Sequence, residues 1–85
     1  MKIYYSNIFE KEYKRLPKKI KDLAEAKEKI FRKNPFDPKL KSHKLTGKLQ
    51  EFWSFSINYQ YRIIFEMVNK KEAWFHSVGT HEIYR

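Results

Sequence analysis

The sequence predicts an α+β fold, in which a β-α-α segment is followed by an antiparallel β meander and the helix pair packs on one face of the sheet. Two observations lead to this prediction. Residues 7–33 repeat apolar side chains at spacings of three and four, whereas residues 41–78 mostly alternate with a period of two. Between them, Asn34-Pro35 ends the helical region, because a residue that precedes proline disfavours helical backbone.

The first half of the chain supplies one strand and two helices. Lys2 to Tyr5 alternates and is rich in β-forming residues, so we expect a strand there. Asn7, followed three residues later by Glu10, resembles a capping box and predicts the start of a short helix. Pro17 fits the first turn of a second helix. The apolar stripe of this helix consists of Ile20, Leu23, Ala24, Ile30 and Phe31.

The second half is predicted to be a loop followed by strands that turns connect. The segment Phe36-Asp37-Pro38 is the loop. The expected strands are residues 41–45, 52–57, 61–68 and 72–78. The expected connections are Thr46-Gly47-Lys48, Asn58-Tyr59-Gln60 and Asn69-Lys70-Lys71.

Length and composition limit the class of protein. The 85 residues allow a single domain over 1–85, which would bury roughly 60 to 65% of its unfolded surface. Its 15 aromatic residues (two Trp, six Tyr and seven Phe) help to build a core. The absence of cysteine argues against a secreted disulfide scaffold. No apolar run is long enough to span a bilayer or to serve as a signal peptide, so we expect a soluble cytoplasmic protein without a membrane partner.

The positive charge is concentrated in the first half. Residues 1–50 hold 15 Lys and Arg against six Asp and Glu, a net of +9, while residues 51–85 hold four of each. Such a surface attracts nucleic acid, although a lysine-rich helix face can also serve only solubility. The segment from residue 39 to residue 48 lacks acidic residues and is too short and irregular for such a helix. Its candidate RNA-binding residues are Lys39, Lys41, Lys44 and Lys48.

Arg62 is the most informative single residue. It is the only arginine between Arg32 and Arg85, and it lies in a strand that otherwise reads as sheet core. Burying a guanidinium is unfavourable unless it has a partner or a substrate. One alternative is a structural ion pair with Glu51 or Glu66. The other alternative is that Arg62 binds a phosphodiester and takes part in its cleavage.

Several segments, in the predicted order of elements, resemble the RelE/ParE superfamily of bacterial toxins from toxin-antitoxin modules. The segments are His43-Lys44-Leu45-Thr46-Gly47, Phe52-Trp53-Ser54-Phe55-Ser56-Ile57, Tyr61-Arg62-Ile63-Ile64-Phe65 and Gly79-Thr80-His81. Within the superfamily, the chain looks most similar to the RelE, YoeB and YafQ type of ribosome-dependent mRNA endonuclease, and the resemblance spans nearly the whole chain. It implies a RelE-like fold and a type II toxin that inhibits translation by cleaving ribosome-bound mRNA without a metal or another cofactor. It also implies an acidic cognate antitoxin as partner, with the toxin alone as a monomer.

The resemblance also implies roles for four residues. Arg62 matches the arginine that stabilises the phosphate, and His43 and His81 match histidines that act as general base and general acid. Tyr84 resembles the terminal aromatic residue that orients the nucleotide. Which histidine is base and which is acid stays open, since relatives have a second histidine and an acidic residue in the central hairpin, where this chain has Ile57 and Tyr61.

The chemistry of RNA cleavage calls for the same residue types independently. A base must take the proton from a 2′-hydroxyl, an acid must protonate the departing 5′-oxygen, and a cation must hold the charged phosphorus centre. Histidine suits both proton roles because its pKa lies near working pH. Arginine matches two phosphate oxygens and stays charged. The product would carry a 2′,3′-cyclic phosphate.

Other interpretations compete with the nuclease. We expect His76, in the middle of a predicted strand, to be structural, and a zinc site of His76 and His81 lacks a third ligand. The Trp and Phe residues of the sheet are more often core than base-stacking platforms. A ParE-like inhibitor of DNA gyrase or a non-catalytic RNA-binding module would share the fold. The presence of His43, His81 and Tyr84 together favours the endoribonuclease.

Overall fold

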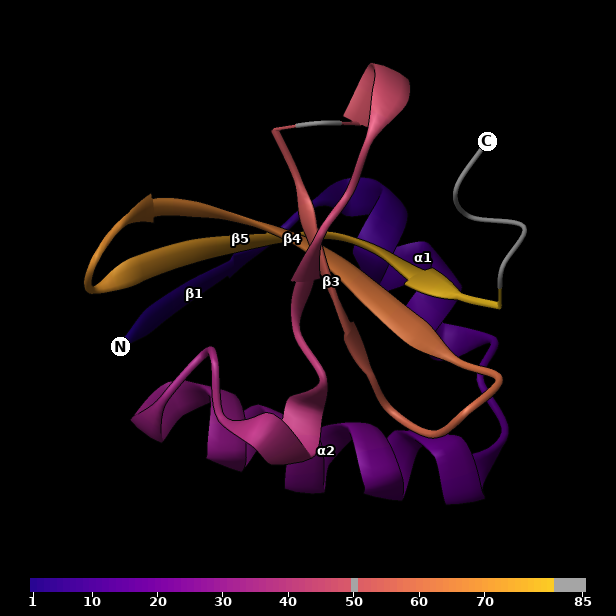
Figure 1. The fold of residues 1–85 in the computed structure, drawn as a ribbon. Coiled ribbons are helices and arrows are strands. Elements are labelled where there is room, and N and C mark those ends of the chain that lie inside the picture. Colours follow the sequence, from indigo (N-terminus) through magenta and orange to yellow (C-terminus); the bar gives the residue numbers. More distant parts are fainter. Residues whose placement is uncertain (50, 81–85) are drawn as a thin grey trace.

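A computed structural model describes residues 1–49 and 51–80, which form a five-stranded mixed sheet with two α-helices (Figure 1). In chain order the elements are β1 (Lys2–Tyr5), α1 (Asn7–Lys14), α2 (Lys18–Lys33), the 3₁₀ helix η1 (Pro38–Leu40), β2 (His43–Lys44), the 3₁₀ helix η2 (Gly47–Leu49), β3 (Trp53–Ser56), β4 (Arg62–Asn69) and β5 (Glu72–Gly79). The strand order is β1-β5-β4-β3-β2. Strand β1 is parallel to β5, and the other pairs are antiparallel. No helix in this part of the chain is long and apolar enough to cross a membrane.

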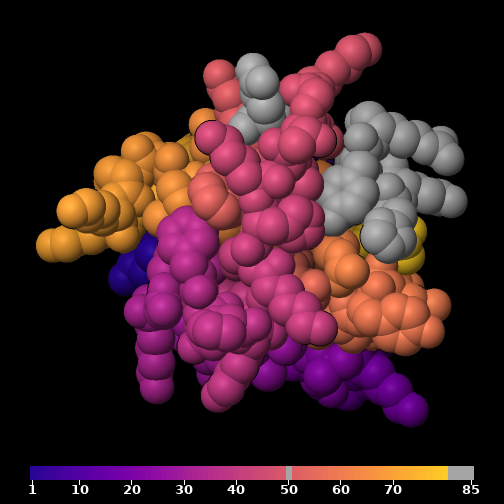
Figure 2. Space-filling view, in the orientation of Figure 1, coloured from indigo at the N-terminus to yellow at the C-terminus, as the bar shows by residue number. Residues whose placement is uncertain are grey.

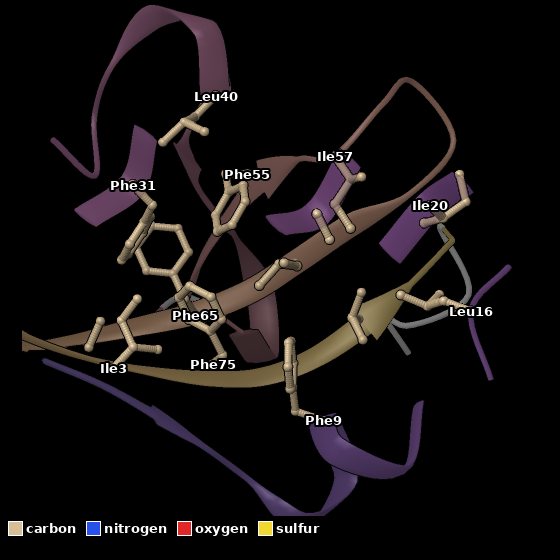
Figure 3. Close-up of a cluster of buried hydrophobic side chains, with 14 residues drawn as sticks. Ile3, Phe9, Leu16, Ile20, Phe31, Leu40, Phe55, Ile57, Phe65 and Phe75 are labelled. Atoms are coloured by element: carbon tan, nitrogen blue, oxygen red, sulfur yellow. The ribbon is translucent and has the colours of Figure 1, made fainter. Parts of the chain in front are cut away.

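The core lies between the helices and one face of the sheet. The Phe31 ring of α2 meets the rings of Phe55, Phe65 and Phe75, with centroids 5.2, 4.9 and 5.0 Å away (Figure 3). Phe75 also meets Phe9 of α1 at 5.6 Å. Because both helices contact the same side chain of β5, they cover the same face of the sheet. The predicted α+β arrangement is therefore confirmed.

Both helices begin differently from the sequence prediction. The N-cap of α1 is Ser6, one residue before Asn7: its Oγ accepts from Phe9 N at 3.0 Å and donates to the carbonyl oxygen of His76 at 2.7 Å. Pro17 lies just before α2, because its ψ of 150° is extended. Its carbonyl oxygen accepts from Ile20 N at 3.0 Å and so begins the helix.

The connection between α2 and β3 is more structured than predicted. Asp37 caps η1 by accepting from Lys39 N at 2.8 Å, and η1 places Leu40 fully in the core. Lys41 then adopts a left-handed conformation with φ of 53°, which interrupts the predicted strand 41–45. Only His43–Lys44 remains as β2. The three longer C-terminal strands, by contrast, match the predicted ranges within one residue.

Helix α1 replaces a strand along part of one sheet edge. Strand β1 ends at Tyr5, so the second half of β5 has no strand on that side. There the Glu12 carboxylate of α1 accepts from Val78 N at 3.0 Å and from Ser77 Oγ at 2.6 Å. These two hydrogen bonds fix the end of β5, which leads to Gly79.

Candidate active site

The face of the sheet opposite the helices carries Arg62. Along β4, Ile63 and Phe65 point into the core, so their neighbour Arg62 points to the other face. Arg62 pairs with Ser56 on β3 and with Gly79 on β5. We call this side, which the helices do not cover, the open face of the sheet.

The guanidinium of Arg62 is held in place by uncharged groups. Its Nη1 donates to Ser56 Oγ at 2.6 Å and to the carbonyl oxygen of Asn58 at 2.8 Å. Among the described residues it forms no ion pair, so neither Glu51 nor Glu66 neutralises it. Nε and Nη2 have no partner within the same part of the chain. This half-buried cation therefore keeps donors available for a bound anion.

The β3–β4 turn explains how Arg62 is positioned. The Asn58 side chain accepts from Gln60 N at 2.9 Å and from Tyr61 N at 2.7 Å, which closes the turn with its own side chain. The Asn58 carbonyl oxygen then faces Arg62. The sequence predicted this turn but did not identify Ser56 and Asn58 as supports of Arg62. The signal was present, since Asn58 begins a turn four residues before the arginine.

His43 lies on the same open face, across β3 from Arg62. It pairs with Ser54, and Ser54 and Ser56 point to the same side of β3. The strands β2 and β4 are two strand spacings apart, and the partners of His43 and Arg62 on β3 differ by two residues. The Cα atoms of His43 and Arg62 are therefore about 12 Å apart. His43 is exposed, and its Nδ1 is 3.3 Å from the carbonyl oxygen of Lys41. A nucleotide on this face would lie between the two side chains.

The other two predicted site residues, His81 and Tyr84, fall outside the described residues. The structure does describe the end of β5 that precedes them. Gly79 is the register partner of Arg62, so β5 ends next to the guanidinium. The roles of His81 and Tyr84 remain predictions.

The four predicted RNA-binding lysines lie on different short elements of one segment. Lys44 pairs with Trp53, whose ring meets Phe36 at 4.9 Å on the helix side of the sheet, so Lys44 and His43 point to opposite faces. Lys39 belongs to η1 and Lys48 to η2, and Lys41 follows η1. All four are exposed. In Figure 2 this pink segment runs along the near side of the molecule.

Aromatic rings occupy the part of the open face away from Arg62. His76 has the expected structural contacts: its Nε2 is 3.1 Å from Glu66 Oε1, and its ring meets Phe52 at 4.9 Å and Trp74 at 6.1 Å. Trp74 also stacks on Tyr4 at 5.1 Å and is 37% exposed. The expectation that the aromatic residues of the sheet are core therefore holds for Phe55, Phe65 and Phe75 but is wrong for Trp74. Tyr4 and His76 hold its ring on the open face.

The fold is similar to that of several solved bacterial toxins. YafQ from E. coli BL21(DE3) superposes with a TM-score of 0.75 at 22% identity, covering 96% of this chain and 94% of YafQ. The YoeB/ParE toxin from Agrobacterium tumefaciens gives 0.80 at 16% identity, with 95% and 99% covered. The E. coli DinJ-YafQ toxin-antitoxin complex gives 0.72 at 24% identity, with 95% and 92% covered. These likenesses establish the fold.

The family follows from the sequence as a whole. Comparison with curated proteins finds no match. The sequence model of the family described as the bacterial toxin of type II toxin-antitoxin system, YafQ, matches residues 1–84. Because this match covers nearly the whole chain, the chain belongs to the YafQ family of type II toxins.

Proposed function

We propose that this toxin is an endoribonuclease that cleaves ribosome-bound mRNA and thereby inhibits translation. The observation that carries the proposal is Arg62, a half-buried guanidinium held by Ser56 and Asn58 without a carboxylate partner among the described residues. A cation kept in this state is suited to an anionic ligand. Family membership supports the proposal, because the RelE, YoeB and YafQ toxins that the chain resembles are mRNA endonucleases.

The proposed reaction needs no metal. One histidine, His43 or His81, takes the proton of the 2′-hydroxyl, and the 2′-oxygen forms a bond to phosphorus. Arg62 holds the phosphate oxygens while negative charge builds up on them. The bond from phosphorus to the 5′-oxygen breaks, and the other histidine protonates that oxygen. The products are a 2′,3′-cyclic phosphate and a 5′-hydroxyl, with Tyr84 orienting the nucleotide.

The same proposal includes two macromolecular partners. On the ribosome, Lys39, Lys41, Lys44 and Lys48 contact phosphates of ribosomal RNA, each adding a modest and salt-dependent share of the affinity. Away from the ribosome, an acidic cognate antitoxin binds the basic toxin in the cytoplasm. Without its antitoxin, the toxin is a monomer. The solved DinJ-YafQ complex supports an antitoxin partner for a protein of this fold.

The test is a parallel assay on two targets. Purified protein is incubated with ribosomes programmed with a defined mRNA, and separately with DNA gyrase and supercoiled DNA. We expect cut mRNA with 2′,3′-cyclic phosphate and 5′-hydroxyl ends, and unaffected gyrase. Intact mRNA together with trapped gyrase cleavage complexes would replace the nuclease with a ParE-like inhibitor. Bound but intact RNA would indicate a non-catalytic RNA-binding module.

A further inference from the structure

A second basic site lies at the end of β4 that is remote from Arg62. Strand β4 begins at Arg62 and ends at Asn69, so its two ends are about 23 Å apart at 3.3 Å per residue. At the Asn69 end, the start of β1, the turn between β4 and β5 and the last turn of α2 come together, on the left of Figure 1. These three segments surround an open hollow whose polar lining residues are Lys2, Arg32, Asn69, Lys71 and Glu72. We call it the basic hollow.

Backbone contacts hold the three segments of the basic hollow together. Lys2 N donates to the carbonyl oxygen of Lys71 at 2.8 Å, which joins β1 to the β4–β5 turn. Arg32 Nη1 donates to the carbonyl oxygen of Met1 at 3.0 Å, which joins α2 to β1. Cationic residues from three distant parts of the sequence therefore line one concave surface. Lys71 belongs to the half of the chain whose own net charge is zero, so the charge count by halves did not predict this site.

The charges of the basic hollow do not balance. Two carboxylates lie there. Glu28 is engaged by Arg32 Nη2 at 3.2 Å and by the Tyr5 hydroxyl, while Glu72 accepts from Asn69 Nδ2 at 2.6 Å and from the Tyr4 hydroxyl at 2.8 Å. Hydrogen bonds from Asn69 and then Tyr4 keep the pKa of Glu72 below its usual value. Against these two, the hollow and its immediate sequence neighbours supply five cations, namely Lys2, Arg32, Lys33, Lys70 and Lys71.

We propose that the basic hollow binds the phosphate backbone of a folded RNA, separately from the strand that Arg62 holds. The inference rests on the proposed function, because it adds a docking site to the same nuclease. A guanidinium and two ammonium groups on a concave surface match neighbouring phosphates. The distance of about 23 Å from Arg62 means that a short substrate does not fill both sites. The partner RNA is ribosomal RNA, which surrounds a toxin that acts on ribosome-bound mRNA.

The lining of the basic hollow favours RNA over an acidic peptide. Protein partners gain most of their affinity from aromatic or aliphatic anchors in pockets. Here Ile3 is 8% exposed, and the Tyr4 ring is already covered by Trp74 and by the Lys2 ammonium, 5.3 Å from its centroid. Five of the seven residues that line the hollow, all but Met1 and Ile3, carry charged or polar side chains, which suit phosphate recognition. An antitoxin segment in the hollow is the competing outcome of the test.

The experiment compares two double variants of equal charge. Lys2→Gln with Lys71→Gln removes two cations from the basic hollow, and Lys18→Gln with Lys19→Gln removes two from the opposite end of α2, where Lys18 pairs with Asp22 at 3.5 Å. Affinity for purified ribosomes carrying a defined mRNA is measured from about 50 to 200 mM salt. For the first variant we expect a salt slope smaller by about 2 and an affinity at low salt lower by about tenfold or more. The control pair should stay within about twofold of the wild type, and single-turnover cleavage of the mRNA at a saturating concentration of ribosomes should be unchanged in both.

Different results would overturn different claims. Equal losses in the two variants would mean that only net charge matters, and an unchanged salt slope in the first variant would exclude the basic hollow as an RNA contact. Weaker antitoxin binding with normal ribosome binding would assign the hollow to the protein partner instead. If the first variant binds ribosomes weakly but the wild type cuts no mRNA, the docking site stands and the nuclease proposal fails. Circular dichroism of both variants checks folding, and Lys71→Gln alone repeats the test if Lys2→Gln disturbs β1.

Discussion

The two faces of the sheet are built from alternate residues of the same strands, yet their chemistry differs completely. On the helix side, Phe55, Phe65 and Phe75 are fully buried around Phe31. On the open face, the neighbouring positions carry Arg62 and Ser56, which accepts a hydrogen bond from it, together with the nearly buried Ile64 and the partly exposed Trp74. Successive side chains of a strand point to opposite faces, so residues that stabilise the core alternate along the chain with residues of the candidate site. A substitution should therefore affect either the folding or the proposed activity, according to the face on which it lies.

The largest effect should come from the buried face. Phe31→Ala should lower the free energy of unfolding by about 3 to 5 kcal/mol, because it leaves a cavity among three other rings. Denaturant titration followed by circular dichroism measures the loss. Leu23→Ala is the matched control on the same helix, since Leu23 is 42% exposed, and it should change stability by less than about 1 kcal/mol. Equal losses for the two would mean that Phe31 does not organise the core.

On the open face, Arg62→Ala should act on turnover and leave folding intact. Loss of the transition-state cation should reduce cleavage of ribosome-bound mRNA by about 10²- to 10³-fold, equivalent to about 3 to 4 kcal/mol. Single-turnover cleavage and ribosome binding, measured separately, should show the loss in the chemical step. Arg15→Ala, an exposed arginine after α1, is the control and should cleave normally. Full activity of Arg62→Ala at normal folding would remove Arg62 from the reaction.

A smaller effect is expected from the support of Arg62. Ser56→Ala deletes the hydroxyl that accepts from Nη1 at 2.6 Å, so the guanidinium should lose part of its positioning, worth about 1 kcal/mol or a several-fold lower turnover. Ser42→Ala removes a hydroxyl bond of similar length, 2.7 Å to the Pro35 carbonyl oxygen, away from the site. It should affect stability alone. A fall in turnover with Ser42→Ala of the same size would show that the loss does not depend on Arg62.

The smallest effect should appear in alkaline solution on the helix side. Burial, followed by the hydrogen bond to Glu28, raises the pKa of Tyr5 from 10.0 to about 12. The folded protein favours the neutral phenol, so Tyr5 contributes stability below pH 10 that is lost as the pH rises toward 12. Thermal unfolding from pH 8 upward should show a shallower decline for Tyr5→Phe than for wild type. Tyr59→Phe, at a residue 85% exposed, should follow the wild type.

Long-range pairing explains why some features were predictable and others were not. The order of elements and the three longer C-terminal strands follow from periodicity, which is local information. The start of α1 does not follow from periodicity. The hydroxyl of its N-cap residue, Ser6, donates a hydrogen bond to the carbonyl oxygen of His76, 70 residues away. Which face of the sheet His43 and Lys44 point to could not be predicted either. Their strand has only two residues, and its pairing with β3 sets its register. Likewise, only the folded chain brings Lys71 beside Lys2 and Arg32.

The parallel pairing of β1 with β5 sets the order in which this toxin can be assembled during its own synthesis. Ile3 is the register partner of Ala73, so β1 has its neighbour in a strand that is made 70 residues later. Contacts so distant along the chain form late, because a long loop must be closed before they are gained. A nascent chain shorter than about this separation has no β5 to receive β1, and no Gly79 beside Arg62. A ribosome that synthesises this protein therefore carries an unfinished sheet until the residues of β5 have been translated.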